Sequence, residues 1–236
     1  LFRTHIHAAY CHSHEVRMSR YLYENFEPSE SYRRRLIEFL RHNTNVETGG
    51  HRLFGGAYDH LFQIPEELTD FIFALKEHEA NNGKMGTFLE IGFASGATNT
   101  ILNKFFNFDD IVAVDTFSDP TCGNALWANL RFKNLTLICG DSTAERTIER
   151  AGSFGPFDLI FIDGNHSYDF VRQDVANYGK LLSKNGVLAL HDIAASNWPD
   201  IPKFWEEVKA GGEWRVREFI HSDYVAHYGI GMMTRP

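Results

Sequence analysis

The sequence is poor in cysteine and contains no long apolar run. Its 236 residues include only three cysteines, Cys11, Cys122 and Cys139. An odd number at such wide spacing fits neither a disulfide framework nor a CxxC metal knuckle, so we expect a reducing, cytoplasmic setting. No stretch reaches the roughly 18 uncharged apolar residues of a membrane span, and Leu1 to Tyr10 lacks the apolar core of a signal peptide. We therefore expect no membrane partner.

Positive charge is scarce as well. The chain has 23 Lys and Arg against 31 Asp and Glu, which gives a formal net charge of -8 at pH 7, and it has no long basic run. Proteins that bind nucleic acids neutralise several phosphates with Lys and Arg. The composition therefore disfavours a nucleic-acid partner, and it leaves open whether the chain forms a homo-oligomer.

The later part of the chain alternates short apolar runs with amphipathic segments. This pattern is typical of a parallel β-sheet covered by helices on both faces. Two further segments, Glu213 to Ile220 and Tyr228 to Thr234, are separated by only about seven residues, so they should pair antiparallel. The sequence thus predicts an α/β fold with a seven-stranded, mostly parallel sheet whose last strand is antiparallel. The other five runs span Thr87 to Ile91, Ile111 to Asp115, Leu135 to Cys139, Phe157 to Asp163 and Gly186 to His191.

The first part of the chain has a different pattern. Glu15 to His42 carries apolar residues at helical spacing, and Pro65 to Glu79 predicts a second amphipathic helix with Pro in its first turn. The polar segment between them, Asn43 to Asp59, could close over a substrate as a lid or could be an ordinary connector. We therefore divide the chain into an N-terminal helical extension, residues 1–64, and an α/β domain, residues 65–236.

A glycine-containing turn follows the first apolar run, in the segment FLEIGFASGATN, residues 88–99. Gly92 and Gly96 permit a tight turn into a helix whose N-terminus presents unpaired N–H groups to a ligand. The spacing is not the GxGxxG of dinucleotide-binding proteins, and an acid, Glu90, lies at the end of the strand. An acid there would repel a pyrophosphate but would attract a ligand with a cationic end. Taken alone, the turn could also be an ordinary α/β connection with incidental glycines.

Two more acids lie at the ends of the next runs. Asp115 ends the second run, where an acid in this kind of fold accepts hydrogen bonds from ribose hydroxyls, and Asp141 and Ser142 follow the third. Each acid alone could be a helix N-cap. In this order, the turn and the acids resemble the class I S-adenosylmethionine (SAM)-dependent methyltransferases, whose turn carries a third glycine where this chain has Ala94. The resemblance implies a Rossmann-like fold and SAM contacts from Glu90, Gly92, Ser95, Gly96, Asp115, Thr116, Asp141 and Ser142.

Acids and a histidine also follow the fourth and fifth runs. Asp163 and Asp192 lie at neighbouring strand ends, and two close carboxylates are costly unless a cation or a shared proton separates them. We therefore predict a divalent cation, Mg²⁺ or another, at this point. His166 would be the general base, since its usual pKa near 6.5 suits neutral pH. Alternatively, the two acids cap helices and His166 is a solvated turn residue.

The same residues resemble the metal and base positions of the metal-dependent sugar O-methyltransferases of macrolide biosynthesis. They are more loosely similar to the catechol O-methyltransferase group, which carries Asp-Asn where this chain has His191 and Asp192. The resemblance implies catalytic roles for Asp163 and His166 and metal binding by Asp163 and Asp192. His191, a residue of the N-terminal part or water would be the third ligand. The implied reaction methylates a hydroxyl of a sugar or of another small natural-product or glycan acceptor.

Other interpretations remain open at this point. The chain could be a metal-independent N- or O-methyltransferase, an NAD-dependent oxidoreductase or a non-catalytic Rossmann-like binding module. Trp198 and Tyr168 follow the strand ends of the predicted site and are candidates for lining the acceptor pocket. Trp205 has the helical spacing of a core residue.

A histidine-rich segment near the start of the sequence lies outside this pattern. It could bind a transition metal, or it could serve subunit contacts. Its members are His5, His7, His12 and His14, together with Cys11.

Overall fold

A computed structural model describes residues 21–41, 63–118, 133–221 and 228–236 of the chain. The histidine-rich segment and the loop Asn43 to Asp59 lie outside the described residues, so the predictions made for them stay predictions. No helix among the described residues is both long and apolar enough to cross a membrane.

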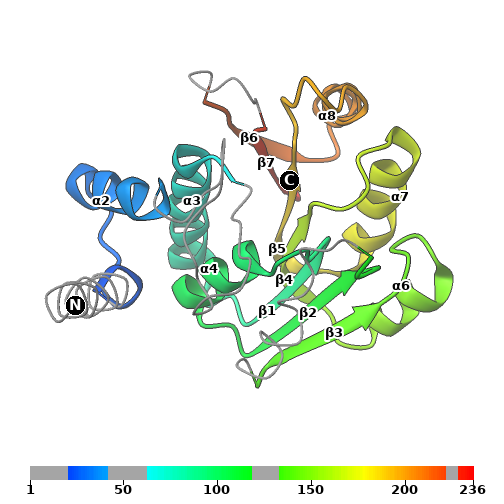
Figure 1. Ribbon diagram of the computed structural model, residues 1–236, viewed down its shortest axis with the longest axis horizontal. Coiled ribbons are helices and arrows are strands. Elements are labelled where there is room, and N and C mark those ends of the chain that lie inside the picture. The colour runs from blue at the N-terminus through cyan, green and yellow to red at the C-terminus, as the bar shows by residue number, and fades with distance from the viewer. Residues whose placement is uncertain (1–20, 42–62, 119–132, 222–227) are drawn as a thin grey trace, which may run out of the picture.

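The described chain is built on one seven-stranded sheet, in the order β3-β2-β1-β4-β5-β7-β6 (Figure 1). Strands β3, β2, β1, β4 and β5 are parallel, and β7 is antiparallel to both of its neighbours. The predicted α/β fold class is therefore confirmed. In chain order, the strands are β1 (Thr87–Ile91), β2 (Asp110–Asp115), β3 (Leu135–Cys139), β4 (Phe157–Ile162), β5 (Leu182–His191), β6 (Arg215–Phe219) and β7 (Ile230–Thr234).

Helices cover both faces of the sheet (Figure 1). On one face, α3 and α4 pack against strands β1, β4 and β5, and α2 adds to the same layer. On the other face lie α6, α7 and α8. The helices are α2 (Glu30–Arg41), α3 (Pro65–Asn82), α4 (Ala97–Phe106), α6 (Glu145–Gly152), α7 (Tyr168–Tyr178) and α8 (Asp200–Gly211), and a short 3₁₀ helix, η2 (Gly179–Leu181), precedes β5.

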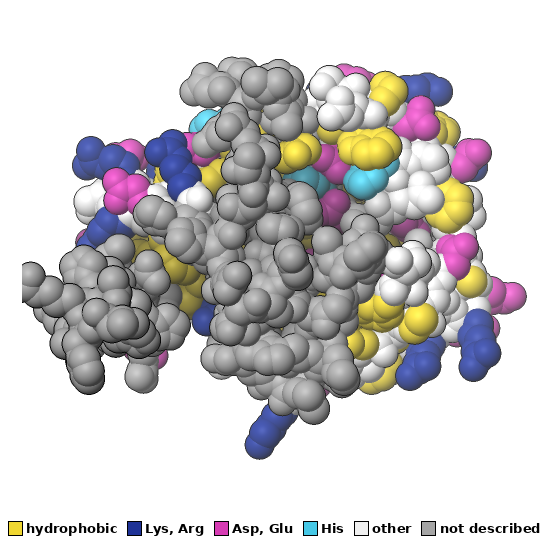
Figure 2. All heavy atoms as spheres, viewed as in Figure 1, with side chains coloured by type: hydrophobic (Ala, Val, Ile, Leu, Met, Phe, Trp, Pro, Cys, Tyr) yellow, Lys and Arg dark blue, Asp and Glu magenta, His cyan; other side chains and the backbone are white. Residues whose placement is uncertain are grey.

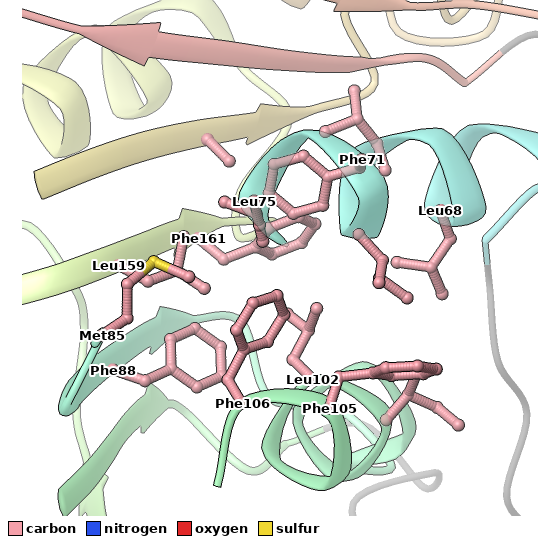
Figure 3. Close-up of a cluster of buried hydrophobic side chains, with 14 of the residues drawn as sticks. Leu68, Phe71, Leu75, Met85, Phe88, Leu102, Phe105, Phe106, Leu159 and Phe161 are labelled. Carbon is pink, nitrogen blue, oxygen red and sulfur yellow. The ribbon is translucent and has the colours of Figure 1, made fainter. Parts of the chain in front are cut away.

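The two faces have separate apolar cores because side chains alternate along a strand. In β4, Leu159 and Phe161 point toward α3 and α4, whereas Ile160 and Ile162 join the core under α6, α7 and α8. Figure 3 shows the first core, in which Phe71 and Leu75 of α3 lie over Phe161 and side chains of α4 approach from below. Burial on both faces explains why the central strands are nearly continuous apolar runs.

The N-terminal helix prediction is correct only in part. The chain is helical at residues 21–24, leaves the helix at residues 25–29 and enters α2 at Glu30. Pro28 explains the break, because proline disfavours helical backbone at the preceding residue. The Ser29 hydroxyl then accepts a hydrogen bond from the Tyr32 N–H at 3.2 Å, as an N-cap does. Within the described residues, α2 packs on α3, and the proposed boundary at residue 64 stays a prediction.

Candidate active site

The turn between β1 and α4 is shaped by two glycines. Gly92 has φ +88°, and a Cβ at this position would lie 1.9 Å from the carbonyl oxygen of Asp163. Any side chain would therefore push apart the ends of β1 and β4, so only glycine fits. Gly96 has φ +75°, precedes α4 and lies under the ring of Phe93, where a Cβ would be 2.4 Å from the ring. Gly96 shapes the turn, and it is not among the residues that line the two cavities described below.

Asp115 holds this turn from the end of β2. Its Oδ2 accepts hydrogen bonds from the backbone N–H groups of Phe93 at 2.7 Å and Ala94 at 2.9 Å, and its Oδ1 accepts one from Phe117 N–H at 2.7 Å. A carboxylate has about four acceptor positions, so some capacity is left for a ligand. Sequence reasoning predicted ribose binding for Asp115 and missed this structural role. Ala94 itself has φ 44°, in the left-handed region that glycine adopts more readily than alanine.

Two cavities open at the carboxyl ends of the strands and meet at Gly92, Ala94 and Asp163. One has a volume of about 300 Å³ and the other about 410 Å³. The first, which we call the reaction cavity, is lined by residues that include Glu90, Ser95, Asp163, His166, His191 and Asp192. The second, the nucleoside cavity, is lined by residues that include Asp115, Thr116, Asp141 and Ser142. The fold thus brings every predicted cofactor residue except Gly96 to one of two adjoining cavities.

Glu90 is a buried acid at the wall of the reaction cavity. Its side chain is only 2% exposed, and its Oε2 accepts a hydrogen bond from Asn99 Nδ2 at 3.0 Å. Burial raises the pKa of Glu90 well above its usual value; the Asn99 bond opposes this shift, and the negative charges of Asp163 and Asp115 add to it. A cationic ligand group beside Glu90 would stabilise the ionised form.

Asp163, His191 and Asp192 converge in the reaction cavity. Nδ1 of His191 lies 3.3 Å from Asp163 Oδ1 and 3.4 Å from Asp192 Oδ2, and one potential metal-ligand atom from each of the three residues lies within 4.8 Å of the others. Consecutive strand residues normally point to opposite faces. Asp192 has φ 64°, and this left-handed turn at the end of β5 brings its side chain to the same site as His191.

His191 is the member of this group with unpaired polar atoms. It is 3% exposed, and neither ring nitrogen has an aligned hydrogen-bond partner among the described residues. Burial lowers the pKa of His191, but the charges of Asp163 and Asp192 outweigh burial and leave the pKa well above its usual value. A buried, unpaired imidazole that faces two carboxylates fits a bound cation, because metal coordination uses both kinds of donor.

His166 lies on the other side of the same carboxylates. Its Nε2 is 2.9 Å from Asp192 Oδ2 and 3.9 Å from Asp163 Oδ1. Burial lowers the pKa of His166, but the interactions with Asp163 and Asp192 outweigh it and raise the pKa to about 9. The indole of Trp198 stacks on the His166 ring, with centroids 4.6 Å apart and planes 13° apart. Trp198 is 46% exposed and lines the reaction cavity.

Sequence reasoning missed several lining residues, and two of them, Gln63 and Tyr228, lie outside the glycine turn. Gln63, 1% exposed and just before α3, places its Nε2 3.4 Å from Asp163 Oδ2. Tyr228, just before β7, has its ring centroid 5.7 Å from that of His191. Neither lies in a motif or at a predicted site strand end, so no sequence signal marks them. Tyr168, predicted to line the pocket, instead donates its hydroxyl to Glu207 at 2.6 Å, whereas Trp205 is buried in the core as expected.

Histidine side chains are visible in Figure 2, beside acidic and hydrophobic side chains, on the described part of one face. In that view, the visible Lys and Arg side chains lie toward the edges of the molecule. Among the described residues, the lining of the reaction cavity includes acids and aromatic rings and no Lys or Arg.

The central segment matches a known family. The family model described as a methyltransferase domain matches residues 89–193, from β1 through Asp192 and Ile193. Residues 89–193 are thus similar to a methyltransferase domain. The match includes the glycine turn, the acids of both cavities and the three converging residues. No curated protein matches the sequence as a relative.

Solved methyltransferase structures share the fold. A Staphylococcus aureus protein assigned as a caffeoyl-CoA O-methyltransferase is 13% identical, with 70% of this chain and 83% of that chain covered and a TM-score of 0.55. The SAH-bound methyltransferase PaMTH1 of Podospora anserina is 17% identical, with 75% and 80% covered and a TM-score of 0.54. MycE of the mycinamycin pathway, in complex with Mg and SAH, is 16% identical, with 72% and 54% covered and a TM-score of 0.50. The chain thus spans about half the length of MycE, and at these identities the likeness establishes the fold.

Proposed function

We propose that the protein is a divalent-metal-dependent O-methyltransferase that uses SAM to methylate a hydroxyl of a sugar or of another small natural-product or glycan acceptor. The observation that carries this proposal is the convergence of Asp163, His166, His191 and Asp192 in a cavity that adjoins the glycine turn. Two carboxylates, two imidazoles and an adjoining nucleoside cavity provide the groups that metal-assisted transfer to oxygen requires.

The two cavities divide the cofactor between them. SAM, when bound, supplies an activated methyl group. Glu90 would hold the cationic amino end in the reaction cavity, Asp115 and Thr116 the ribose, and Asp141 and Ser142 the adenine. The contact of both cavities at Gly92 supports this arrangement, because one elongated ligand can pass over a residue without a side chain. SAH in the complexes of MycE and PaMTH1 is consistent with it.

Asp163, His191 and Asp192 would hold the metal ion. A divalent cation supplies Lewis acidity that lowers the pKa of an acceptor hydroxyl. The fit rests on the unpaired nitrogens of His191 and on the two carboxylates that face it. The Mg ion in the MycE complex supports a metal in this fold.

His166 would accept the proton of the acceptor hydroxyl. Without a cation, the negative charges of Asp163 and Asp192 raise the pKa of His166 to about 9, so His166 is protonated at neutral pH. A base must be neutral before it accepts a proton, so the charge of Asp163 and Asp192 has to be offset. A cation held by the same carboxylates offsets it, which makes the base function of His166 dependent on the metal site.

Trp198 and Tyr228 would receive the acceptor. Trp198 stacks on the proposed base, is 46% exposed and lines the reaction cavity, and Tyr228 lines the same cavity beside His191. Aromatic faces bind the apolar face of a ring while polar groups fix its hydroxyls. This favours a ring-shaped acceptor with hydroxyl groups.

The test measures transfer of the SAM methyl group to a panel of hydroxylated sugars and catechols, with chelator and after addition of divalent metal. We expect activity to be lost in chelator and restored by metal, and His166→Gln to lower kcat by about 10²- to 10⁴-fold. His78→Gln is the matched control, since His78 lies on α3 and bonds the Asn185 carbonyl oxygen at 2.6 Å. Full activity in chelator would favour a metal-independent methyltransferase instead.

A further inference from the structure

The ligand set of the proposed metal site differs from an all-oxygen site. It comprises two carboxylates, from Asp163 and Asp192, and one imidazole, from His191. We propose that this site selects a first-row transition dication, such as Mn²⁺ or Co²⁺, over Mg²⁺. The inference rests on the proposed metal-dependent function and concerns the identity of the ion.

Imidazole is a poor ligand for Mg²⁺. This ion prefers oxygen ligands at near-ideal octahedral geometry and keeps several of its waters. Imidazole nitrogen suits iron, nickel, copper and zinc ions, and the affinity of a given nitrogen and oxygen site rises along the first-row dications from Mn²⁺ through Co²⁺ to Cu²⁺. One nitrogen ligand among three protein ligands therefore lowers the affinity for Mg²⁺ relative to a transition dication.

His191 cannot easily be left out of the ligand set. It is the last residue of β5, and its Nδ1 lies within 3.4 Å of a carboxylate oxygen of each neighbouring acid. An ion held by both Asp163 and Asp192 would lie against this nitrogen. The side chain is 3% exposed and enclosed by the rings of Phe161 and Tyr228, at centroid distances of 6.2 Å and 5.7 Å. It therefore has little room to turn away from such an ion.

A metal-free ion cluster is the main rival explanation. In that case, His191 would be an imidazolium that neutralises the two carboxylates. An imidazolium donates from both nitrogens. Nδ1 of His191 faces carboxylate oxygens at 3.3 Å and 3.4 Å, although without good alignment, and Nε2 has no acceptor among the described residues. Leaving a buried donor unpaired costs stability. The rival predicts that none of the three dications binds.

The experiment titrates the chelator-treated full chain with Mg²⁺, Mn²⁺ and Co²⁺ by calorimetry. Any site with nitrogen and oxygen ligands prefers later transition ions to some extent, so a preference in the wild-type protein alone does not identify His191 as a ligand. The decisive quantity is the change in the ratio of Mn²⁺ affinity to Mg²⁺ affinity between the wild-type protein and His191→Asp. We expect the wild-type protein to prefer Mn²⁺ and Co²⁺, and the variant, with an all-oxygen set, to reduce the ratio by about tenfold or more. His78→Asp is the matched control and should leave the ratio unchanged.

A second measurement detects the nitrogen ligand directly. Pulsed electron paramagnetic resonance of bound Mn²⁺ should detect an imidazole nitrogen in the wild-type protein, and this signal should be absent in His191→Asp. Equal affinities for Mg²⁺ and Mn²⁺, an unchanged ratio in His191→Asp, or no nitrogen signal would overturn the inference. Absence of binding by all three ions would overturn both the inference and the metal in the proposed function. SAM titration of the same sample separates these failures from a failure of cofactor binding.

Discussion

The buried carboxyl group of Asp174 should make the stability of the fold depend on pH. Asp174 lies on α7, is 0% exposed, and has no aligned hydrogen-bond partner for either oxygen among the described residues. Oδ2 of Asp174 lies close to Gly164, which lines the nucleoside cavity: a Cβ added to Gly164 would be 3.7 Å from this oxygen. Burial raises the pKa of Asp174 to about 7; the Ser142 side chain opposes this shift, and the charge of Asp141 adds to it. The ionised form is therefore disfavoured in the folded state.

The size and sign of the effect follow from this pKa. Raising it from the usual 3.8 to about 7 corresponds to about 4 kcal/mol between folded and unfolded states. Well below pH 4 both states are protonated, and the carboxyl costs nothing extra. As pH rises from 4 to 7 the unfolded state ionises first, so stability falls, and above pH 7 the full loss of about 4 kcal/mol is present. In Asp174→Asn this loss should be absent.

Urea unfolding at pH 5 and pH 8 measures the effect. The free energy of unfolding of Asp174→Asn minus that of wild type should rise between pH 5 and pH 8 by a large part of about 4 kcal/mol. Effects of pH on other groups cancel in this difference. Asp169→Asn, an exposed acid on the same helix, is the matched control and should show a difference that changes little with pH. A flat difference for Asp174→Asn would refute the buried, unpaired state of the carboxyl.

Three further outcomes are expected from the same structure. Ala94→Gly should leave the free energy of unfolding unchanged or raise it by up to about 1 kcal/mol, because Ala94 has φ 44°. The control Ala176→Gly, within α7, should lower the free energy of unfolding by about 1 kcal/mol. Urea titrations that show the same loss of stability in both variants would contradict this. The Glu67 carboxylate accepts hydrogen bonds at 2.9 Å from the backbone N–H groups of His221 and Gly229, in the segment between β6 and β7. Glu67→Ala should therefore lower the free energy of unfolding by on the order of 3 kcal/mol, and Glu67→Gln should lower it less. Equal losses in the two variants would show that these hydrogen bonds do not stabilise the fold. Glu90→Gln should weaken SAM binding in calorimetry by about 10- to 100-fold, and unchanged affinity would remove Glu90 from the cofactor site.

Periodicity and strand-end acids were sufficient to predict most of the fold. Strands β1 and β3 have the predicted bounds, and the antiparallel pairing of β7 follows from its short connection to β6. Apolar runs predict buried strands because both faces of the sheet are covered. The helix break at Pro28 was missed because the apolar spacing continues across it, although the proline itself carried the signal.

The site was predicted where its residues follow strands. Asp163, His191 and Asp192 converge because parallel strands end at one edge of the sheet. Gln63 and Tyr228 reach the same cavity from segments far away in sequence, and only tertiary packing brings them there. The left-handed backbone of Asp192 is also invisible in the sequence, yet it determines that His191 and Asp192 face one site.

Calorimetric titration with SAM, alongside NAD, tests the proposed cofactor function most directly. The wild-type protein should bind SAM in a saturable 1:1 manner and should not bind NAD, because Glu90 attracts a cationic group and repels a pyrophosphate. Binding of NAD without binding of SAM would contradict the proposed function and favour an oxidoreductase or another Rossmann-like binding protein.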